Sequence, residues 1–176
     1  MSDAAQQSLF NQAESPEPQQ PLRSALTKAY RLLAGRARSE KELRDALVRA
    51  KFSSDVIAAV ITDCKKQHFL DDANFTRQYI QSRLRNRPMG RERLVVELRQ
   101  KGVAAEIIHT ALDEFFAEQN QLVLADQLAE KQRKRLANLP PPKARQRLAD
   151  FLRRRGFDWE TIQATRLWKE LEYGGG

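Results

Sequence analysis

The stretch LVVELRQKGVAAEII, residues 94–108, carries the pattern on which the fold of this chain depends. Its apolar residues Leu94, Leu98, Val103 and Ile108 follow one another at steps of four, five and five. Two other stretches repeat these steps; their residues are Leu43, Leu47, Phe52 and Ile57, and Leu148, Leu152, Phe157 and Ile162. A repeat of about 50 residues indicates stacked helical units. We therefore expect function to lie along a surface rather than in one pocket.

The residues around these apolar positions indicate helices and turns rather than strands. No segment alternates apolar and polar residues as a strand does, so we predict no sheet. Gly102 and Gly156 follow apolar helical segments, where glycine favours a left-handed C-terminal turn. Lys51 stands at the equivalent place in the first stretch, so we expect the turn there to differ.

We predict an all-α fold of three tandem three-helix repeats, at residues 22–70, 71–118 and 119–173. Adjacent repeats should stack, because a unit of about 50 residues alone buries little surface. Residues 1–21 are rich in Gln, Ser, Pro and Ala and predict a disordered tail, and Gly174–Gly176 predict a flexible end. Pro140–Pro142 account for the slightly longer spacing before the third stretch.

The chain is strongly basic. It contains 31 Lys and Arg against 23 Asp and Glu, which gives a formal net charge of +8. Residues 1–21 contain three acidic residues and no Lys or Arg, so residues 22–176 carry +11. A charge of this size and sign favours a polyanionic partner, either nucleic acid or an acidic protein surface.

The sequence shows no catalytic or metal-binding signature. It lacks a glycine-rich phosphate loop, and His68 and His109 have no partner at metal-ligand spacing. Cys64, the only cysteine, lies among apolar positions and is more typical of a buried side chain than of a nucleophile. We therefore expect no enzymatic activity and no cofactor. No apolar run approaches the ~20 residues that span a bilayer, so we predict a cytoplasmic protein without a membrane partner.

Arginines cluster at the predicted turn in the middle of the chain. Five fall within eleven residues, opposed there only by Glu92; they are Arg83, Arg85, Arg87, Arg91 and Arg93. The equivalent turn of the first repeat and the segment before Gly156 carry similar clusters; these are Arg31, Arg36 and Arg38, and Arg153, Arg154 and Arg155. Guanidinium groups bind phosphates and carboxylates with forked hydrogen bonds, which makes these arginines the candidate binding residues. A solvated helix end explains Arg153–Arg155 equally well.

Three stretches of the chain resemble one known protein family. The residues that carry the resemblance are Ala29–Ala34 with Arg38–Arg44, then Phe69–Phe75 with Gly90 and Glu97–Val103, and finally Arg145–Leu148 with Phe151–Phe157. Together they cover about residues 22–172, and their order and spacing resemble those of the RecX family, which regulates the bacterial recombinase RecA.

The resemblance implies three tandem three-helix repeats in an elongated, curved molecule. It also implies a bacterial protein that lies in the groove of the RecA–DNA filament, with single-stranded and double-stranded DNA as further partners. Such proteins restrain strand exchange, ATP hydrolysis and the co-protease activity that triggers the SOS response. The arginine clusters would face this filament, and we expect the protein to act as a monomer.

Two other functions fit a set of basic helical repeats. The first is direct binding of DNA through helix-turn-helix-like units, without a filament. The second is a helical scaffold for an acidic protein partner. Salt-sensitive DNA binding in the absence of RecA would favour the first, and binding that is indifferent to nucleic acid would favour the second.

Overall fold

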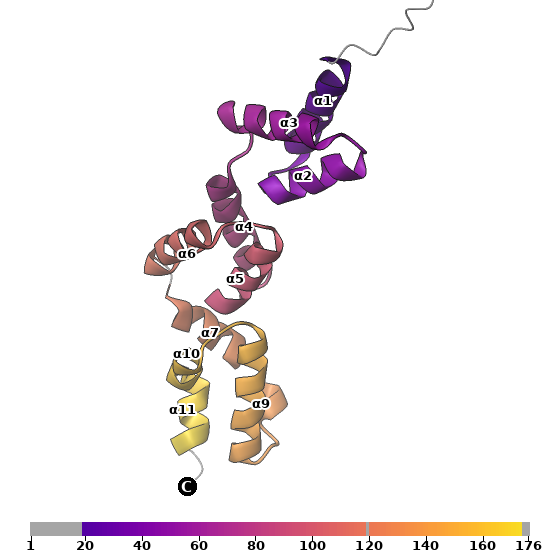
Figure 1. The fold of residues 1–176 in the computed structure, drawn as a ribbon. Helices are drawn as coiled ribbons and strands as arrows, with labels where there is room; N and C mark the ends of the chain where they lie inside the picture. Colours follow the sequence, from indigo (N-terminus) through magenta and orange to yellow (C-terminus); the bar gives the residue numbers. More distant parts are fainter. Residues whose placement is uncertain (1–18, 119, 174–176) are drawn as a thin grey trace, which may run out of the picture. The chain divides into compact units, whose positions relative to one another are not determined.

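The computed structural model describes residues 19–118 and 120–173, which fold into helices without any strand (Figure 1). This confirms the prediction of an all-α protein. The described residues divide into two compact units. The first comprises the residues up to Arg38 together with Glu42–Leu70, and the second comprises Ser39–Lys41 together with the residues from Asp71 onward.

The first unit is built on three helices, α1 (Gln19–Gly35), α2 (Glu40–Arg49) and α3 (Ser54–Lys66). Its core contains three of the four apolar residues of the first repeated stretch, and half-buried Phe52 packs against it. The buried residues are Ala25, Ala29, Leu43, Leu47, Ile57, Val60, Ile61, Cys64 and Leu70. The apolar spacing therefore identified the core-facing side of these helices correctly.

The predicted tail is three residues too long at its C-terminal end. Helix α1 begins at Gln19, so Pro21 is its third residue. Proline is tolerated in the first turn of a helix, because the amide it lacks would have no partner inside the helix there. The rest of the predicted tail and Gly174–Gly176 lie outside the described residues.

The second unit holds the second and third repeats. The second repeat consists of α4 (Asp72–Asn86), α5 (Arg91–Gln100) and α6 (Ala105–Glu118). The third consists of α7 (Gln121–Glu130), α8 (Arg133–Leu136), α9 (Pro141–Arg154), α10 (Trp159–Ala164) and α11 (Arg166–Tyr173). Each repeat has its own apolar cluster, and Leu124 packs against both clusters. In Figure 1, α9 and α11 run side by side, in agreement with their contacts.

The third repeat departs from the expectation of three helices. A short helix, α8, precedes the prolines. The end of the repeat forms two helices, α10 and α11, which are separated at Thr165, whose backbone is extended (φ −62°, ψ 144°). The break folds α11 back, so that the ring of Trp168 lies edge-on to that of Trp159 with their centroids 5.2 Å apart. The two tryptophans therefore lie on different helices, and Trp168 is buried whereas Trp159 is 48% exposed.

The second and third repeats turn from one helix into the next through the same backbone geometry. Gly102 N–H donates to Arg99 O (2.9 Å), and Val103 N–H donates to Leu98 O (3.2 Å). In the third repeat, Gly156 N–H donates to Arg153 O (2.9 Å), and Phe157 N–H donates to Leu152 O (3.2 Å). Gly102 and Gly156 have positive φ angles (77° and 84°), which glycine adopts without strain.

The first repeat makes this turn as well, which overturns the expectation that Lys51 would change it. Lys51 N–H donates to Val48 O (2.8 Å), Phe52 N–H donates to Leu47 O (3.3 Å), and Lys51 has a φ of 63°. The apolar side chains of Leu47 and Phe52 pack in the core of the first unit, and their spacing sets the turn. Lys51 is thereby held in a left-handed conformation, which is energetically costly for any residue that has a Cβ atom.

Lys51→Gly is expected to stabilise the first unit by about 1 kcal/mol, because glycine removes the cost of a left-handed residue. Cys64 offers the measurement, since it is the only cysteine and its side chain is fully buried in this unit. Burial, and then the charge of Asp63, also raises the pKa of its thiol. Reaction of Cys64 with a thiol reagent should therefore slow by roughly fivefold in Lys51→Gly.

Ala50→Gly is the matched control, because Ala50 precedes the turn and is not in the left-handed region. Glycine at this position should destabilise the unit and accelerate the reaction of Cys64 with the reagent. Acceleration in both variants would show that Lys51 is not strained.

The second and third repeats are joined where the C-terminal end of α9 meets the N-terminal end of α5. Gly90 N–H donates to Arg155 O (2.8 Å), and Glu92 N–H donates to Gly156 O (3.1 Å). Amides that are free at the start of one helix thus bind carbonyls at the end of the other. The positive end of the α5 dipole faces the negative end of the α9 dipole, which is favourable.

This joint has no room for a side chain at either glycine. A Cβ on Gly90 would lie 2.1 Å from Gly156 O, and a Cβ on Gly156 would lie 2.3 Å from Arg93 N. Real Cβ atoms do not approach backbone atoms so closely. The sequence marked both residues as turn residues, but only the structure shows that they touch.

Candidate functional site

The five central arginines surround the joint on the side of the second repeat. Arg83 and Arg85 lie in the last turn of α4, Arg87 is its C-terminal cap, and Arg91 and Arg93 lie in the first turn of α5. Arg85, Arg87 and Arg93 are exposed, whereas Arg83 and Arg91 are half-buried. The short segment Pro88–Gly90 therefore brings the ends of two helices, and their arginines, together.

A buried carboxylate holds two of these arginines. Glu97 Oε2 accepts hydrogen bonds from Arg83 Nε (2.7 Å) and from the Tyr79 hydroxyl (2.9 Å), and lies 2.6 Å from Arg83 Nη2. Glu97 Oε1 accepts from Arg93 Nε (3.0 Å). The side chain of Glu97 is only 7% exposed. One carboxylate therefore bridges the two guanidinium groups.

The ionisation of Glu97 follows from these contacts. Burial alone would raise the pKa of its carboxyl group, but the hydrogen bonds from Arg83, Tyr79 and Arg93 and the charge of Arg83 outweigh burial and lower it. The hydrogen bond to Glu97 in turn raises the pKa of Arg83. Glu97 is therefore charged at neutral pH, and two arginines share one negative charge.

A second acidic residue pairs with Arg91. Its Nη2 lies 2.7 Å from Asp113 Oδ1 on α6, and 3.5 Å from His109 Nδ1. The sequence indicated Glu92 as the only acidic residue among the five arginines. In the structure, Glu97 and Asp113 pair with three of them and neutralise part of their charge. Glu97 follows Arg93 by four residues, a spacing that pairs charges along a helix and could have been noticed. Asp113 comes from another helix and gave no local signal.

Arg85 and Arg87 differ from the other three central arginines. Within residues 19–118 and 120–173, neither forms an ion pair, and both are exposed. Among the five central candidates, these two are therefore the most available to an external anion.

The joint brings a second predicted cluster next to the first. Arg153 and Arg154 are exposed at the end of α9, and the guanidinium of Arg155 lies over the ring of Phe151, 5.3 Å from its centroid. The carbonyl of Arg155 accepts from Gly90 N–H, directly before Arg91. The arginines of the second and third repeats therefore adjoin one another in the second unit.

The three candidates of the first repeat lie in the other unit, so the prediction that they face the same filament as the central cluster stays a prediction. Arg31 is exposed. Arg36 Nη1 donates to Glu42 Oε2 (2.9 Å), and Arg38 Nε donates to Leu32 O (3.0 Å). Burial, followed by the charge of Arg36, lowers the pKa of Arg38.

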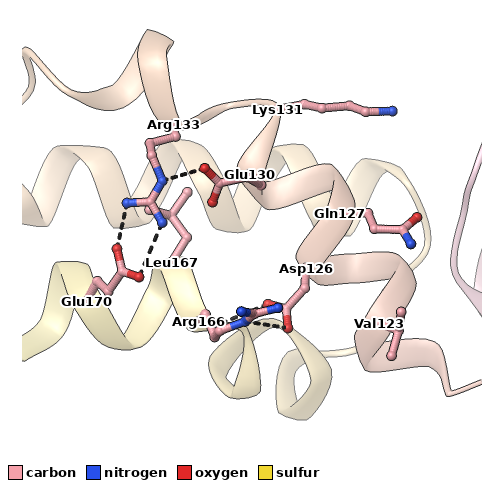
Figure 2. Close-up of a pocket in the computed structure, with 9 residues that line it drawn as sticks. All are labelled: Val123, Asp126, Gln127, Glu130, Lys131, Arg133, Arg166, Leu167 and Glu170. Atoms are coloured by element: carbon pink, nitrogen blue, oxygen red, sulfur yellow. Dashed lines mark hydrogen bonds and ion pairs between the residues drawn. The ribbon is translucent and has the colours of Figure 1, made fainter.

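A cavity of about 680 Å³ in the third repeat is not suited to binding a polyanion, because carboxylates lie beside its cationic side chains (Figure 2). Figure 2 shows Arg133 between Glu130 and Glu170, to which it donates hydrogen bonds of 2.7 and 2.6 Å. Arg166 lies 3.6 Å from Asp126 on the same wall. Most of the positive charge here is matched by carboxylates, and none of the predicted arginines lines the cavity.

The described part of the chain contains no group of three His, Cys, Asp or Glu side chains that could hold a metal ion. None of its helices is both long enough and apolar enough to cross a bilayer.

Comparison with known proteins identifies relatives over most of the chain. Models of the first, second and third three-helix domains of RecX match residues 25–64, 71–112 and 119–165, in this order. A protein named Regulatory protein RecX from Chlorobaculum tepidum is 38% identical over 144 residues, which cover 81% of this chain and 86% of that protein. Its namesake from Pelodictyon phaeoclathratiforme is 36% identical over 140 residues, covering 80% and 85%.

Solved structures show the same fold. The crystal structure of RecX from Lactobacillus salivarius superposes with a TM-score of 0.78 and covers 86% of this chain and 97% of that one, at 21% sequence identity. At this level of identity the likeness concerns the fold, and the curated relatives carry the inference about the family.

Proposed function

We propose that this chain, which belongs to the RecX family of regulatory proteins, binds the RecA–DNA filament and inhibits its ATP hydrolysis, strand exchange and co-protease activities. Its role would be regulatory and non-catalytic. The observation that carries the proposal is the match of three RecX domains, in order, to a chain 36% and 38% identical to two curated family members.

The arrangement of charge in the second unit supports this proposal. The arginines at the end of α4, at the start of α5 and at the end of α9 adjoin one another across the joint. A basic surface of this kind suits the phosphates of DNA or acidic side chains of a protein filament. The backbone contacts of the joint fix the two helix ends, so the surface is presented without a large loss of conformational freedom.

Binding to the filament is distinguished from the two other functions by a co-sedimentation experiment. The chain is mixed with RecA filaments formed on DNA, with RecA alone and with DNA alone. We expect most of the chain to sediment with the filaments and less with either component. Equal binding to DNA with and without RecA would favour a stand-alone DNA-binding protein and would contradict the proposal.

A further inference from the structure

Glu97 is the only charged residue buried in the described chain, and it lies under the candidate site. Taking a carboxylate out of water costs free energy. A buried apolar side chain usually stabilises a protein at least as much as a buried ion pair does. A buried charge whose partners are half-exposed or exposed arginines is better explained by what it does to those arginines. Here it fixes where both guanidinium groups lie.

The two guanidinium groups retain donors after Glu97 has been satisfied. Arg83 uses Nε and Nη2 on Oε2, and Arg93 uses Nε on Oε1. The guanidinium of Arg83 also lies over the ring of Tyr79, 5.7 Å from its centroid, and a hydrogen bond with Tyr79 helps to raise its pKa. Both terminal nitrogens of Arg93 have no hydrogen-bond partner within residues 19–118 and 120–173. The group of three side chains has a net charge of +1, with donors from two planar forks held close together.

We infer that Arg83 and Arg93, positioned by Glu97, form a clamp that binds one phosphate group of a nucleic-acid backbone. This inference deepens the proposed function, on which it rests, by assigning the clamp to DNA rather than to RecA. Glu97 is a positioning residue in this account, because it acts through the arginines and does not touch the ligand. Tyr79, which donates to the same carboxylate, supports it.

The surroundings of the clamp favour a phosphate over an acidic protein surface. Protein interfaces contain aromatic and other apolar side chains at their centre. Val96 is the only large apolar side chain exposed on α4 or α5 among the described residues. The clamp is instead flanked by the exposed, unpaired Arg85 and Arg87 and adjoins Arg153 and Arg154 across the joint. A succession of cations with few exposed apolar side chains between them is typical of contacts to a nucleic-acid backbone.

The test compares two variants that change the charge of α5 equally. Glu97→Gln removes the carboxylate of the clamp, and Glu92→Gln removes an exposed carboxylate five residues earlier. Both add +1 to the same helix, so a simple effect of net charge would tighten DNA binding in both. We measure affinity for a fluorescent oligothymidylate by anisotropy, in the absence of RecA, between about 50 and 200 mM salt.

We expect Glu97→Gln to weaken binding by roughly tenfold despite its higher positive charge, because the arginines lose their fixed positions. The slope of log affinity against log salt should fall by about 0.7, the value of one phosphate contact on a single strand. Glu92→Gln should bind as tightly as the unmodified chain or more tightly. Equal or tighter binding by Glu97→Gln would overturn the clamp, and so would the absence of any DNA binding by the unmodified chain.

A charge-conserving variant keeps the inference testable if Glu97→Gln does not fold, which circular dichroism would reveal. Arg93→Lys retains the charge. The guanidinium of arginine can bind Glu97 with one nitrogen and a phosphate with the others, whereas lysine has a single ammonium nitrogen and cannot bind both in this way. We expect it to weaken DNA binding severalfold, and unchanged affinity would contradict the clamp.

The clamp and the proposed function fail in different ways. Loss of RecA inhibition by Glu97→Gln, with DNA binding intact, would assign the arginines to RecA and overturn the clamp alone. Weaker DNA binding by Glu97→Gln, in a protein that never inhibits RecA, would support the clamp and contradict the proposed function.

Discussion

Gly156→Ala is expected to destabilise the second unit by about 3 kcal/mol. A left-handed alanine costs roughly 1–2 kcal/mol, and loss of the hydrogen bonds of the joint adds about 1 kcal/mol or more. The new Cβ would meet Arg93 N at 2.3 Å and force α5 and α9 apart. Trp159 and Trp168 both lie in the third repeat, so their fluorescence during unfolding in denaturant measures this loss.

Two further glycines separate the causes of the loss. Gly90 has an ordinary φ of −82°, so Gly90→Ala introduces the contact with Gly156 O without a left-handed residue. We expect it to destabilise the unit as well, although less than Gly156→Ala does. Gly35→Ala is the control, because nothing lies within 4 Å of its Cβ position. Unchanged unfolding of Gly90→Ala would show that the joint does not form in solution.

Removal of Arg85 and Arg87 is expected to have the largest effect on function. Both side chains are exposed and unpaired within the described residues, so the double alanine variant should remain folded. If each contacts one phosphate, the slope of log affinity against log salt falls by roughly 1.4 on single-stranded DNA and about 1.8 on duplex DNA, and affinity falls by more than tenfold at moderate salt. The readout is the concentration of the chain that halves DNA-stimulated ATP hydrolysis by RecA.

The double variant Arg49→Ala with Lys66→Ala provides the control. It removes the same charge from the last turns of α2 and α3, outside the candidate site. We expect a change of at most about twofold, from the loss of general electrostatic attraction. Equal weakening by both double variants would mean that net charge, and not the central cluster, governs binding. Replacing all five central arginines would be less informative, because Glu97 would then be buried without its partners.

The sequence was sufficient for the repeats and for most of the core. Steps of four, five and five between apolar residues place Leu47 and Phe52 at the same turn as Leu98 and Val103, and the structure agrees. The error about Lys51 shows which signal dominates. The backbone follows the apolar spacing, because burial of several side chains outweighs the roughly 1–2 kcal/mol cost of one left-handed lysine.

Contacts between helices could not be predicted from the sequence. The pairing of Arg91 with Asp113 joins residues on different helices, and the contact between Gly90 and Gly156 joins different repeats. The break at Thr165 was missed because no proline or glycine marks it. There the hydroxyl of Thr165 donates to Ile162 O (2.8 Å), and Asp126 on α7 accepts from the first amide of α11 (2.8 Å). Such features depend on tertiary partners rather than on local propensity.

Inhibition of RecA tests the central claim of this account most directly. RecA filaments are formed on single-stranded DNA, the folded chain is added up to saturation, and the rate of ATP hydrolysis is followed. We predict a rate that falls with increasing concentration of the chain, and a weaker effect for the Arg85→Ala, Arg87→Ala variant. A full rate of hydrolysis at saturating concentrations of the folded chain would contradict it.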